Sequence, residues 1–295
     1  MKKKKINVPP ALRWHGGKKY LSEWLGSMLP KHIHRVHLYA GGLAEARTWP
    51  IEGYSLVAND INGLLMNFYR VLQGEETFKA FMRKVAAVPV SRKEWDEADN
   101  MMGGAIASGV PVHYGGHAHV DGAVSFFIWN RQSMAGRMDC FSPLTRKRTR
   151  GGRNAEVNSW WGAIDGLLEF KAYLDNYVLE CDKALKVLKR EDGEDSLFYL
   201  DPPYVNCDKG EGRTTPDVFH YEMTTKDHED LMKAITGGLQ GKVMLSGYRS
   251  ELYDDYLTEE RGWVRKEKEI DNKAAKGAVK RKMVECCWMN YKPGV

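Results

Sequence analysis

The sequence contains little cysteine, five residues in a chain of 295, and none of them stands in Cys-x-x-Cys spacing. An odd number without that spacing indicates neither a disulfide framework nor a zinc knuckle. Cys286 and Cys287 fall in a stretch predicted to be a buried strand, where cysteine behaves as a small apolar residue. We therefore expect reduced, structural thiols here and at the remaining positions, Cys140, Cys181 and Cys207.

Long apolar runs are also missing. No segment approaches the roughly 18 uninterrupted apolar residues of a transmembrane helix. The N-terminus begins with lysines but meets Pro9, Pro10 and Arg13 without the apolar region of a signal peptide. The sequence therefore predicts neither a membrane span nor a secretion signal, and we expect a cytoplasmic protein without membrane partners.

Net charge is small, because 44 lysines and arginines face 39 aspartates and glutamates, which leaves +5. The basic residues are unevenly distributed, since residues 131–153 hold seven of them against Asp139 alone. The rest of the chain is almost neutral, so a polyanionic partner would have to bind this segment or the N-terminal lysines. The seven residues are Arg131, Arg137, Arg146, Lys147, Arg148, Arg150 and Arg153.

Alternating strand and helix patterns predict an α/β fold with a parallel sheet. Short apolar runs bounded by turn residues predict buried strands at 35–40, 54–59, 197–200 and 242–246. Helical periodicity occupies 19–29, 63–73, 79–88, 226–236 and 160–188, the last as one helix or two. Two further strands at 263–270 and 283–291, joined by the loop 271–282, predict a late antiparallel pair.

The alternation is interrupted between about residues 91 and 153, a glycine-rich segment that includes the basic cluster. A parallel core tolerates large excursions at its loops, so this segment is interpreted as an insertion. His113, His117 and His119 lie within it, but they lack the cysteine or carboxylate partners of common metal sites. We interpret them as a polar loop and predict no metal site.

The most specific motif is Asp201-Pro202-Pro203-Tyr204, which directly follows a predicted buried strand. Open α/β sheets bind ligands at the carboxyl ends of their strands, and two prolines hold the backbone extended there. An acid and an aromatic at this position suit the transfer of a group to the exocyclic amine of a nucleic-acid base. That amine is a poor nucleophile, because its lone pair is delocalised into the ring. The Asp201 carboxylate and the Pro202 carbonyl would favour the charge that develops on this nitrogen during transfer. Tyr204 would stack on a base taken out of the duplex.

A second motif begins at Gly41-Gly42, after the first predicted strand, and ends at Asp60, after the second. The interval from Gly41 to Asp60 is 19 residues, close to the roughly 20 that separate a glycine-rich turn from the ribose-binding acid of Rossmann-type sites. Glycine after a strand is also ordinary turn chemistry, so this spacing is weak evidence when taken alone.

Together these motifs resemble the Dam-type (D12 class) DNA adenine N6-methyltransferases, and they occur in the order of that family. The resemblance extends beyond the two motifs above. RWHGGK at 13–18 is similar to the family's K-W-A-G-G-K, LYAGGLAEA at 38–46 to its glycine motif, and NDIN at 59–62 to its ribose motif. FFIWNR at 126–131 resembles its F-x-x-N-R segment, LSGY at 245–248 matches a downstream motif, and Glu285, Trp288, Asn290 and Tyr291 resemble its E-x-L-W-x-N-Y ending.

The resemblance implies a Rossmann-like S-adenosylmethionine-dependent methyltransferase fold with an inserted target-recognition domain. Residues 1–89 and 191–295 would form the catalytic domain, and 90–190 the DNA-binding insert. The implied cofactor-binding residues are Trp14, Lys18, Tyr39, Gly41, Asp60 and Asp201. A lysine can bind the methionine carboxylate, and a tryptophan face can pack on the sulfonium. The chain departs from the family's usual Glu-Pro-Phe before the glycines, since it has His37, Leu38 and Tyr39.

The implied activity is methylation of adenine N6 in double-stranded DNA by a monomer in a bacterial or phage-infected cell. The expected catalytic residues are Asp201, Pro202 and Tyr204. The basic residues Arg146, Lys147, Arg148, Arg150 and Arg153 are expected to bind phosphates, a contribution that does not depend on sequence but is weakened by salt. Asn130 and Arg131 are expected to serve either the structure or the reading of base edges.

Two alternatives remain at this stage. The acceptor could be cytosine N4 or RNA, although Asp201 favours adenine because the similar cytosine-N4 enzymes usually carry serine at that position. The chain could also be a DNA-binding relative without catalytic activity. The presence of Asp201, Tyr204, Lys18 and Asp60 argues against this second alternative.

Overall fold

The computed structural model describes residues 7–107, 117–142, 149–150, 152–205, 221–271 and 282–294. The chain divides into two compact units. Unit 1 comprises residues 1–26, 40–52 and 60–181, and unit 2 comprises residues 27–39, 53–59 and 182–295. Within the described parts of the chain, no helix has both the length and the apolar character needed to cross a membrane.

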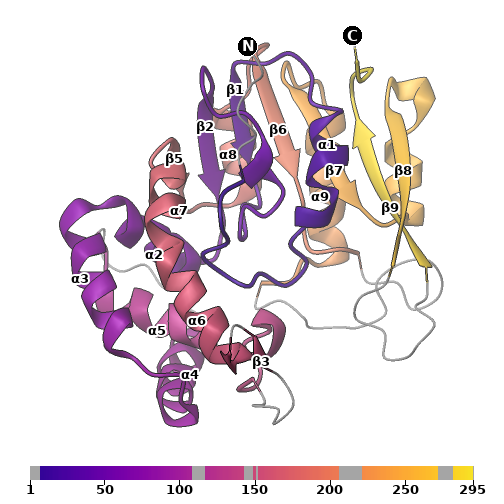
Figure 1. Ribbon diagram of the computed structural model, residues 1–295. Coiled ribbons are helices and arrows are strands. Elements are labelled where there is room, and N and C mark those ends of the chain that lie inside the picture. Colours follow the sequence, from indigo (N-terminus) through magenta and orange to yellow (C-terminus); the bar gives the residue numbers. More distant parts are fainter. Residues whose placement is uncertain are drawn as a thin grey trace. The chain divides into compact units, whose positions relative to one another are not determined.

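Unit 2 contains most of the main sheet. Six of the seven strands described for that sheet belong to this unit, in the order β2-β1-β6-β7-β9-β8. Figure 1 shows these strands side by side. Their bounds are β1 His34–His37, β2 Ser55–Asn59, β6 Ser196–Leu200, β7 Lys242–Gly247, β8 Val264–Asp271 and β9 Lys282–Met289.

The first four of these strands are parallel, and the last two are antiparallel. β1 pairs in parallel with β2 and β6, and β6 pairs in parallel with β7. β9 runs antiparallel to both β7 and β8. The predicted parallel strands and the late antiparallel pair are thus confirmed. The carboxyl ends of the parallel strands lie at one edge of the sheet, and Asp201 directly follows β6.

Alternation along the strands of unit 2 separates an apolar face from a more polar one. Val36, Phe198, Val243 and Trp288 belong to a buried apolar cluster. Residues of α8 (Ala184–Arg190), α9 (Thr225–Thr236) and α10 (Glu251–Tyr256) complete this cluster. The neighbouring strand positions, which point to the other face, include His37, Tyr199 and Ser246. The remaining helical turn of the unit is η4, Glu259–Arg261.

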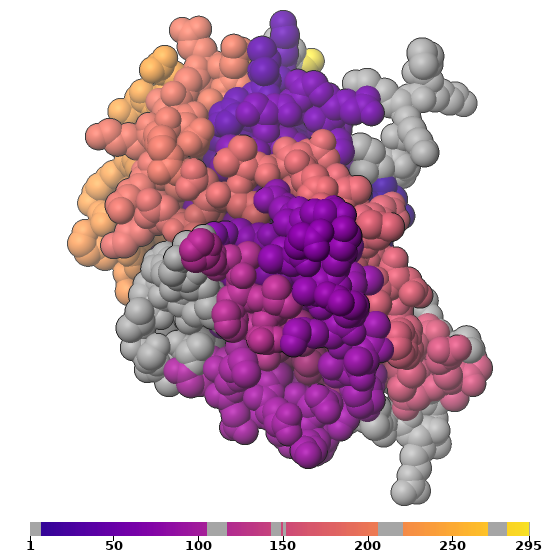
Figure 2. Space-filling model, turned by 90° about the vertical axis from the view of Figure 1, so that its left-hand side faces the viewer, coloured from indigo at the N-terminus to yellow at the C-terminus, as the bar shows by residue number. Residues whose placement is uncertain are grey.

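Unit 1 is mainly helical. Its helices are η1 Lys19–Leu21, α1 Ser22–Gly26, η2 Ala46–Thr48, α2 Gly63–Gln73, α3 Glu75–Ala87, α4 Arg92–Ala107, α5 Val120–Arg131, η3 Met134–Gly136, α6 Ala155–Asp165 and α7 Leu167–Leu174. Its strands are β5 Tyr177–Glu180 and the short antiparallel pair β3 Thr149–Arg150 and β4 Arg153–Asn154. The outer surface of α3 and α4 faces the viewer in Figure 2.

Aromatic side chains from several helices form the core of unit 1. Phe68 of α2 stacks on Phe127 of α5 with ring centroids 5.9 Å apart, and Phe81 of α3 meets Phe127 edge to face at 5.6 Å. Trp160 of α6 lies 5.1 Å from Phe127. All these rings are buried. Phe127 is at the centre of this core, because the other three rings all contact it. Large buried aromatics contribute most of the area removed from water.

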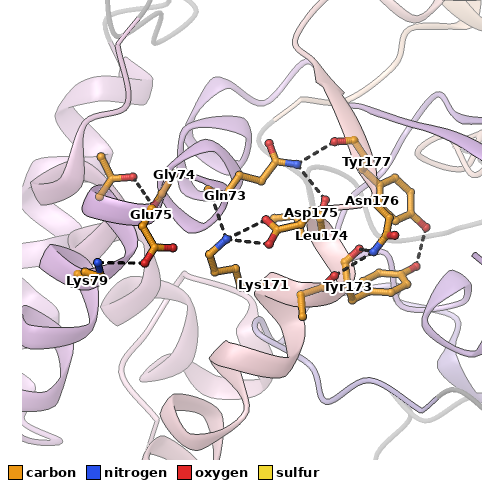
Figure 3. Close-up of polar contacts among 12 residues, drawn as sticks. Gln73, Gly74, Glu75, Lys79, Lys171, Tyr173, Leu174, Asp175, Asn176 and Tyr177 are labelled. Atoms are coloured by element: carbon orange, nitrogen blue, oxygen red, sulfur yellow. Dashed lines mark hydrogen bonds and ion pairs between the residues drawn. The ribbon is translucent and has the colours of Figure 1, made fainter.

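The prediction of one helix or two over 160–188 is wrong in part, because strand β5 lies between α7 and α8. The turn that ends α7 is fixed by bonds from distant residues. Gln73 at the end of α2 donates its side-chain amide to the backbone oxygens of Leu174 and Tyr177, at 2.9 and 2.8 Å. Lys171 donates to the Gln73 carbonyl and to Asp175, as Figure 3 shows. These long-range bonds override the local helical periodicity.

Candidate active site

The glycine motif and the acid motif meet within unit 1. The Gly41 amide donates to Asp60 Oδ2, and the Asn62 amide donates to Asp60 Oδ1, both at 2.9 Å. Asn62 in turn caps α2, since its side-chain oxygen accepts from the amides of Leu64 and Leu65. Burial raises the pKa of Asp60, and the two amide bonds oppose that shift. A carboxylate offers about four acceptor positions, so each oxygen retains capacity for a hydroxyl donor.

Gly41 occupies a position that other residues would not fit. Its φ is +47°, in the left-handed region that favours glycine. A Cβ at Gly41 would lie 2.6 Å from the indole nitrogen of Trp14, and one at Gly42 would lie 2.7 Å from the Trp14 Cβ. The Tyr69 hydroxyl donates to the Gly41 carbonyl at 2.5 Å. The glycine turn is therefore held between an indole, a tyrosine and the Asp60 carboxylate.

Lys18 and Tyr39 are two further residues predicted to bind a cofactor. Lys18 lies in unit 1, directly before η1, and its side chain is buried. Tyr39 lies in unit 2, directly after a buried leucine, and packs against the apolar cluster of that unit. The two residues thus belong to different units, and only Lys18 belongs to the unit that contains Gly41 and Asp60.

In unit 2, Asp201 is connected to the interior by a chain of hydroxyl groups. Ser246 Oγ lies 3.3 Å from Asp201 Oδ1 and 3.2 Å from the Leu200 carbonyl. The Tyr199 hydroxyl lies 3.0 Å from Ser246 Oγ, and both side chains are buried. Because Ser246 has a single hydroxyl proton, donation towards Asp201 and Leu200 leaves it to accept from Tyr199. This arrangement orients the carboxylate at the end of β6.

Tyr204 is held on the antiparallel side of the sheet. Its hydroxyl donates to Glu285 Oε1 of β9 at 2.5 Å, and its ring meets Tyr248 edge to face at 4.6 Å. Burial, together with the charges of Glu285 and Asp201, raises the pKa of Tyr204 well above its ordinary value. The phenol is therefore a hydrogen-bond donor at neutral pH. Pro202, between the two functional side chains, is buried.

Asn130 and Arg131 are buried and bind other parts of unit 1. The Asn130 side chain accepts from the Arg13 amide and donates to the Arg13 carbonyl, both at 2.9 Å. Arg131 donates to the Ser159 carbonyl at 2.9 Å. Burial and the neighbouring Arg13 guanidinium lower the pKa of Arg131 to about 9. Of the two roles considered for these residues, the contacts favour the structural one, because they fix the N-terminal motif against α5 and α6.

The basic segment is described only in part. Arg146, Lys147 and Arg148 lie outside the described residues, and of Arg150 only the backbone in β3 is described. Arg153 begins β4, directly opposite Arg150, and its side chain is exposed. The hairpin therefore brings the backbones of two of the predicted phosphate-binding residues side by side.

The histidine loop is also described in part, because His113 lies outside the described residues. His119 is the N-cap of α5, where its Nδ1 accepts from the Gly122 amide at 2.9 Å. Its backbone exchanges two hydrogen bonds with the Asn67 side chain. Among the residues that the structure describes, no group of three histidine, cysteine or acidic side chains is close enough to hold a metal. His119 is thus assigned a local structural role.

Comparison with known proteins identifies the family. A family model for D12 class N6 adenine-specific DNA methyltransferases matches residues 14–272. The chain belongs to this family. The D12 match runs from Trp14 through the glycine, acid, DPPY and LSGY motifs, and with the seven-stranded sheet it is consistent with a Rossmann-like methyltransferase fold. The family's description names N6 adenine-specific DNA methyltransferases, enzymes that require a methyl donor.

The chain is also similar to a DNA N-6-adenine-methyltransferase of Escherichia phage P1, at 23% identity over 253 residues. This match covers 82% of the present chain and 31% of the phage protein, so the chain spans about a third of the length of that relative.

Two residues of this site, Ser246 and Glu285, belong to the family-like motifs of the sequence, but the sequence alone assigns them no role. Ser246 follows β6 by 46 residues of chain and Glu285 follows Tyr204 by 81, so only the pairing of β6 with β7 and of β7 with β9 brings them to the DPPY segment. The one available signal is polarity, because Ser246 follows three apolar residues at the end of one predicted strand and Glu285 lies among apolar residues of another.

Proposed function

We propose that this chain transfers a methyl group from S-adenosylmethionine to the exocyclic N6 of adenine in double-stranded DNA. The observation that carries the proposal is the Asp201-Pro202-Pro203-Tyr204 segment at the carboxyl end of β6, with Ser246 bonded to its carboxylate and Glu285 to its phenol. An acid and an aromatic fixed together at a strand end suit a planar base that carries an amine.

The residues of unit 1 fit the proposed cofactor. Asp60 retains acceptor capacity for ribose hydroxyls, and the absence of a side chain at Gly41 leaves room for the Trp14 indole beside the turn. Trp14 would contribute an aromatic face for the adenosyl or sulfonium group, and Lys18 a cation for the carboxylate. When bound, S-adenosylmethionine supplies an electrophilic methyl group, so the protein needs no metal for the transfer.

The chain's own residues would act on the acceptor amine. Asp201 would accept a hydrogen bond from one amino hydrogen, and the Pro202 carbonyl would accept one from the other. Both acceptors favour the positive charge that develops on the nitrogen as the new bond forms. Tyr204 would stack on the extruded ring, because an enzyme that acts on a base must remove it from the helix stack.

DNA would be held largely through phosphates. Arg146, Lys147, Arg148, Arg150 and Arg153 are the residues proposed for this contact, in a segment whose charge exceeds that of the whole chain. The exposed position of Arg153 in the β3–β4 hairpin supports this assignment for that residue.

Transfer of tritium from labelled S-adenosylmethionine to duplex DNA tests the proposed function. We expect incorporation by the wild-type chain. Asp201→Ala should abolish transfer while largely retaining DNA binding in a gel-shift titration, because Asp201 is not among the residues proposed to bind the DNA phosphates. Retained turnover in Asp201→Ala would contradict the assignment of that residue.

A further inference from the structure

Glu285 is a buried carboxylate in the middle of β9, with 1% of its surface exposed. Glutamate is rarely buried to this degree unless it is paired, because taking a charge out of water is costly. The next three residues of the same strand, Cys286, Cys287 and Trp288, are also buried, and none of them carries a charge. Burial in this strand therefore does not require a carboxylate. Packing alone therefore does not account for a carboxylate here.

The side chain bonded to Glu285 is Tyr204 of the DPPY segment. The phenol donates to Oε1 at 2.5 Å, and this bond joins residues 81 positions apart. Hydrogen bonds to an ionised acceptor are roughly twice as strong as those between neutral groups. Turning the Tyr204 ring away would leave the buried carboxylate without this bond, which opposes such movement.

Two further contacts fix the plane of the ring. Tyr248 meets Tyr204 with an interplanar angle of 68° and centroids 4.6 Å apart. A Cβ at Gly247 would lie 3.9 Å from Tyr204 Cδ1, so the ring lies close to the backbone at the end of β7. The ring is thus held at its hydroxyl by Glu285 and contacted by the Tyr248 ring and the end of β7, in an orientation set before any base arrives.

We propose that Glu285 is a positioning residue that holds the Tyr204 ring in the orientation that receives the target base. The proposal rests on the proposed function, in which Tyr204 stacks on that base. Glu285 touches neither base nor cofactor in this account and acts through Tyr204. Fixing the ring in advance lowers the entropic cost of binding the base, because the Tyr204 side chain loses less conformational freedom when the base stacks on it.

Four variants separate positioning from a general role in folding. Glu285→Met removes the acceptor and keeps similar bulk, whereas Glu285→Gln keeps an oxygen acceptor without the charge. Tyr204→Phe removes the donor and keeps the ring. Glu269→Gln, on the neighbouring strand β8 and paired with Lys282 at the surface, is the matched control. Each is compared by its single-turnover rate of methyl transfer, its KM for S-adenosylmethionine and its melting temperature.

We expect Glu285→Met to lower the single-turnover rate by about 10- to 100-fold, with the KM for S-adenosylmethionine changed less than about twofold. Glu285→Gln should recover part of the lost rate, because it keeps an acceptor but loses the charge, and Glu269→Gln should match the wild type. Tyr204→Phe should show a similar loss of rate. The double variant, Tyr204→Phe with Glu285→Met, should lose little more than Tyr204→Phe alone, because the two substitutions remove the same hydrogen bond.

Three results would overturn the proposal, and they are distinguishable from a failure of the proposed function. A wild-type rate in Glu285→Met would show that the acceptor is not needed for positioning. Additive losses in the double variant would show that the two side chains act independently. If Glu285→Met does not fold, Tyr204→Phe and Glu285→Gln still test the bond, and a wild-type rate in Tyr204→Phe would refute it. Absence of transfer by the wild type would instead refute the enzyme function.

Discussion

The Gly41 amide donates to Asp60 Oδ2 at 2.9 Å, so one hydrogen bond joins the glycine turn to the acid 19 residues later. We expect Gly41→Ala to weaken binding of S-adenosylmethionine at least tenfold. The new methyl group would meet the Trp14 indole, and a non-glycine residue in the left-handed region costs about 1–3 kcal/mol. Isothermal titration calorimetry measures this affinity.

Gly53→Ala is the matched control for that change. Gly53 also has a positive φ, +81°, but a Cβ there would meet no heavy atom within 4 Å. Both variants therefore carry backbone strain, and only Gly41→Ala adds a steric clash at the motif. Equal affinities in the two variants would contradict the assignment of the glycine turn to the cofactor.

Ser246→Ala tests whether the hydroxyl chain orients Asp201. We expect the rate of methyl transfer to fall about tenfold or more, because the carboxylate loses a bond and the Tyr199 hydroxyl loses its partner Ser246. Ser196→Ala is the control, since Ser196 is also buried but lies at the opposite end of β6, bonded to the Glu191 carbonyl. A rate equal to that of Ser196→Ala would rule out the orienting role.

Neutralising Arg146, Arg148 and Arg150 together should weaken DNA binding at all sequences. If each binds one phosphate, the slope of log affinity against log salt should become shallower by up to about 3. The comparison is a variant with the same change of charge at Lys186, Lys189 and Arg190, which are exposed in or at the end of α8 of unit 2. An unchanged slope in the first variant would mean that the cluster does not contact DNA.

Unfolding stability should decrease as pH falls from about 6.5 to 4. Burial lowers the pKa of His228 from 6.5 to about 4, and that of His32 by a similar amount. In this range the unfolded chain binds more protons than the folded one. The contribution of these histidines to the free energy of unfolding is therefore complete above pH 6.5 and is lost as the pH falls towards 4. Each histidine accounts for up to about 3 kcal/mol by this linkage.

Urea unfolding at several pH values measures this loss. His228→Gln should show a flatter pH dependence between 6.5 and 4, because glutamine does not titrate there. His228 Nδ1 lies 3.0 Å from the Tyr253 hydroxyl, so the variant is also expected to be less stable at pH 7. The same pH dependence in wild type and variant would exclude His228 as a source.

Strand periodicity is enough to predict six of the seven strands described for the main sheet. The parallel strands preceding Asp60 and Asp201 are short, apolar and bounded by turn residues, so their local signal agrees with the fold. The strand Tyr177–Glu180 was not predictable in this way, because bonds from Gln73, more than a hundred residues earlier, fix the turn before it. Glu285 and Ser246 likewise acquire their roles only through strand pairing.

Nucleoside analysis of the methylated product tests the central claim most directly. Labelled S-adenosylmethionine is incubated with a duplex DNA, with an RNA of the same sequence, and with a duplex in which adenine carries no N6 amine. After enzymatic digestion, the account predicts label in N6-methyl-2′-deoxyadenosine from the first duplex alone. Label in N4-methylcytosine, label in RNA, or no transfer by the folded chain would contradict it.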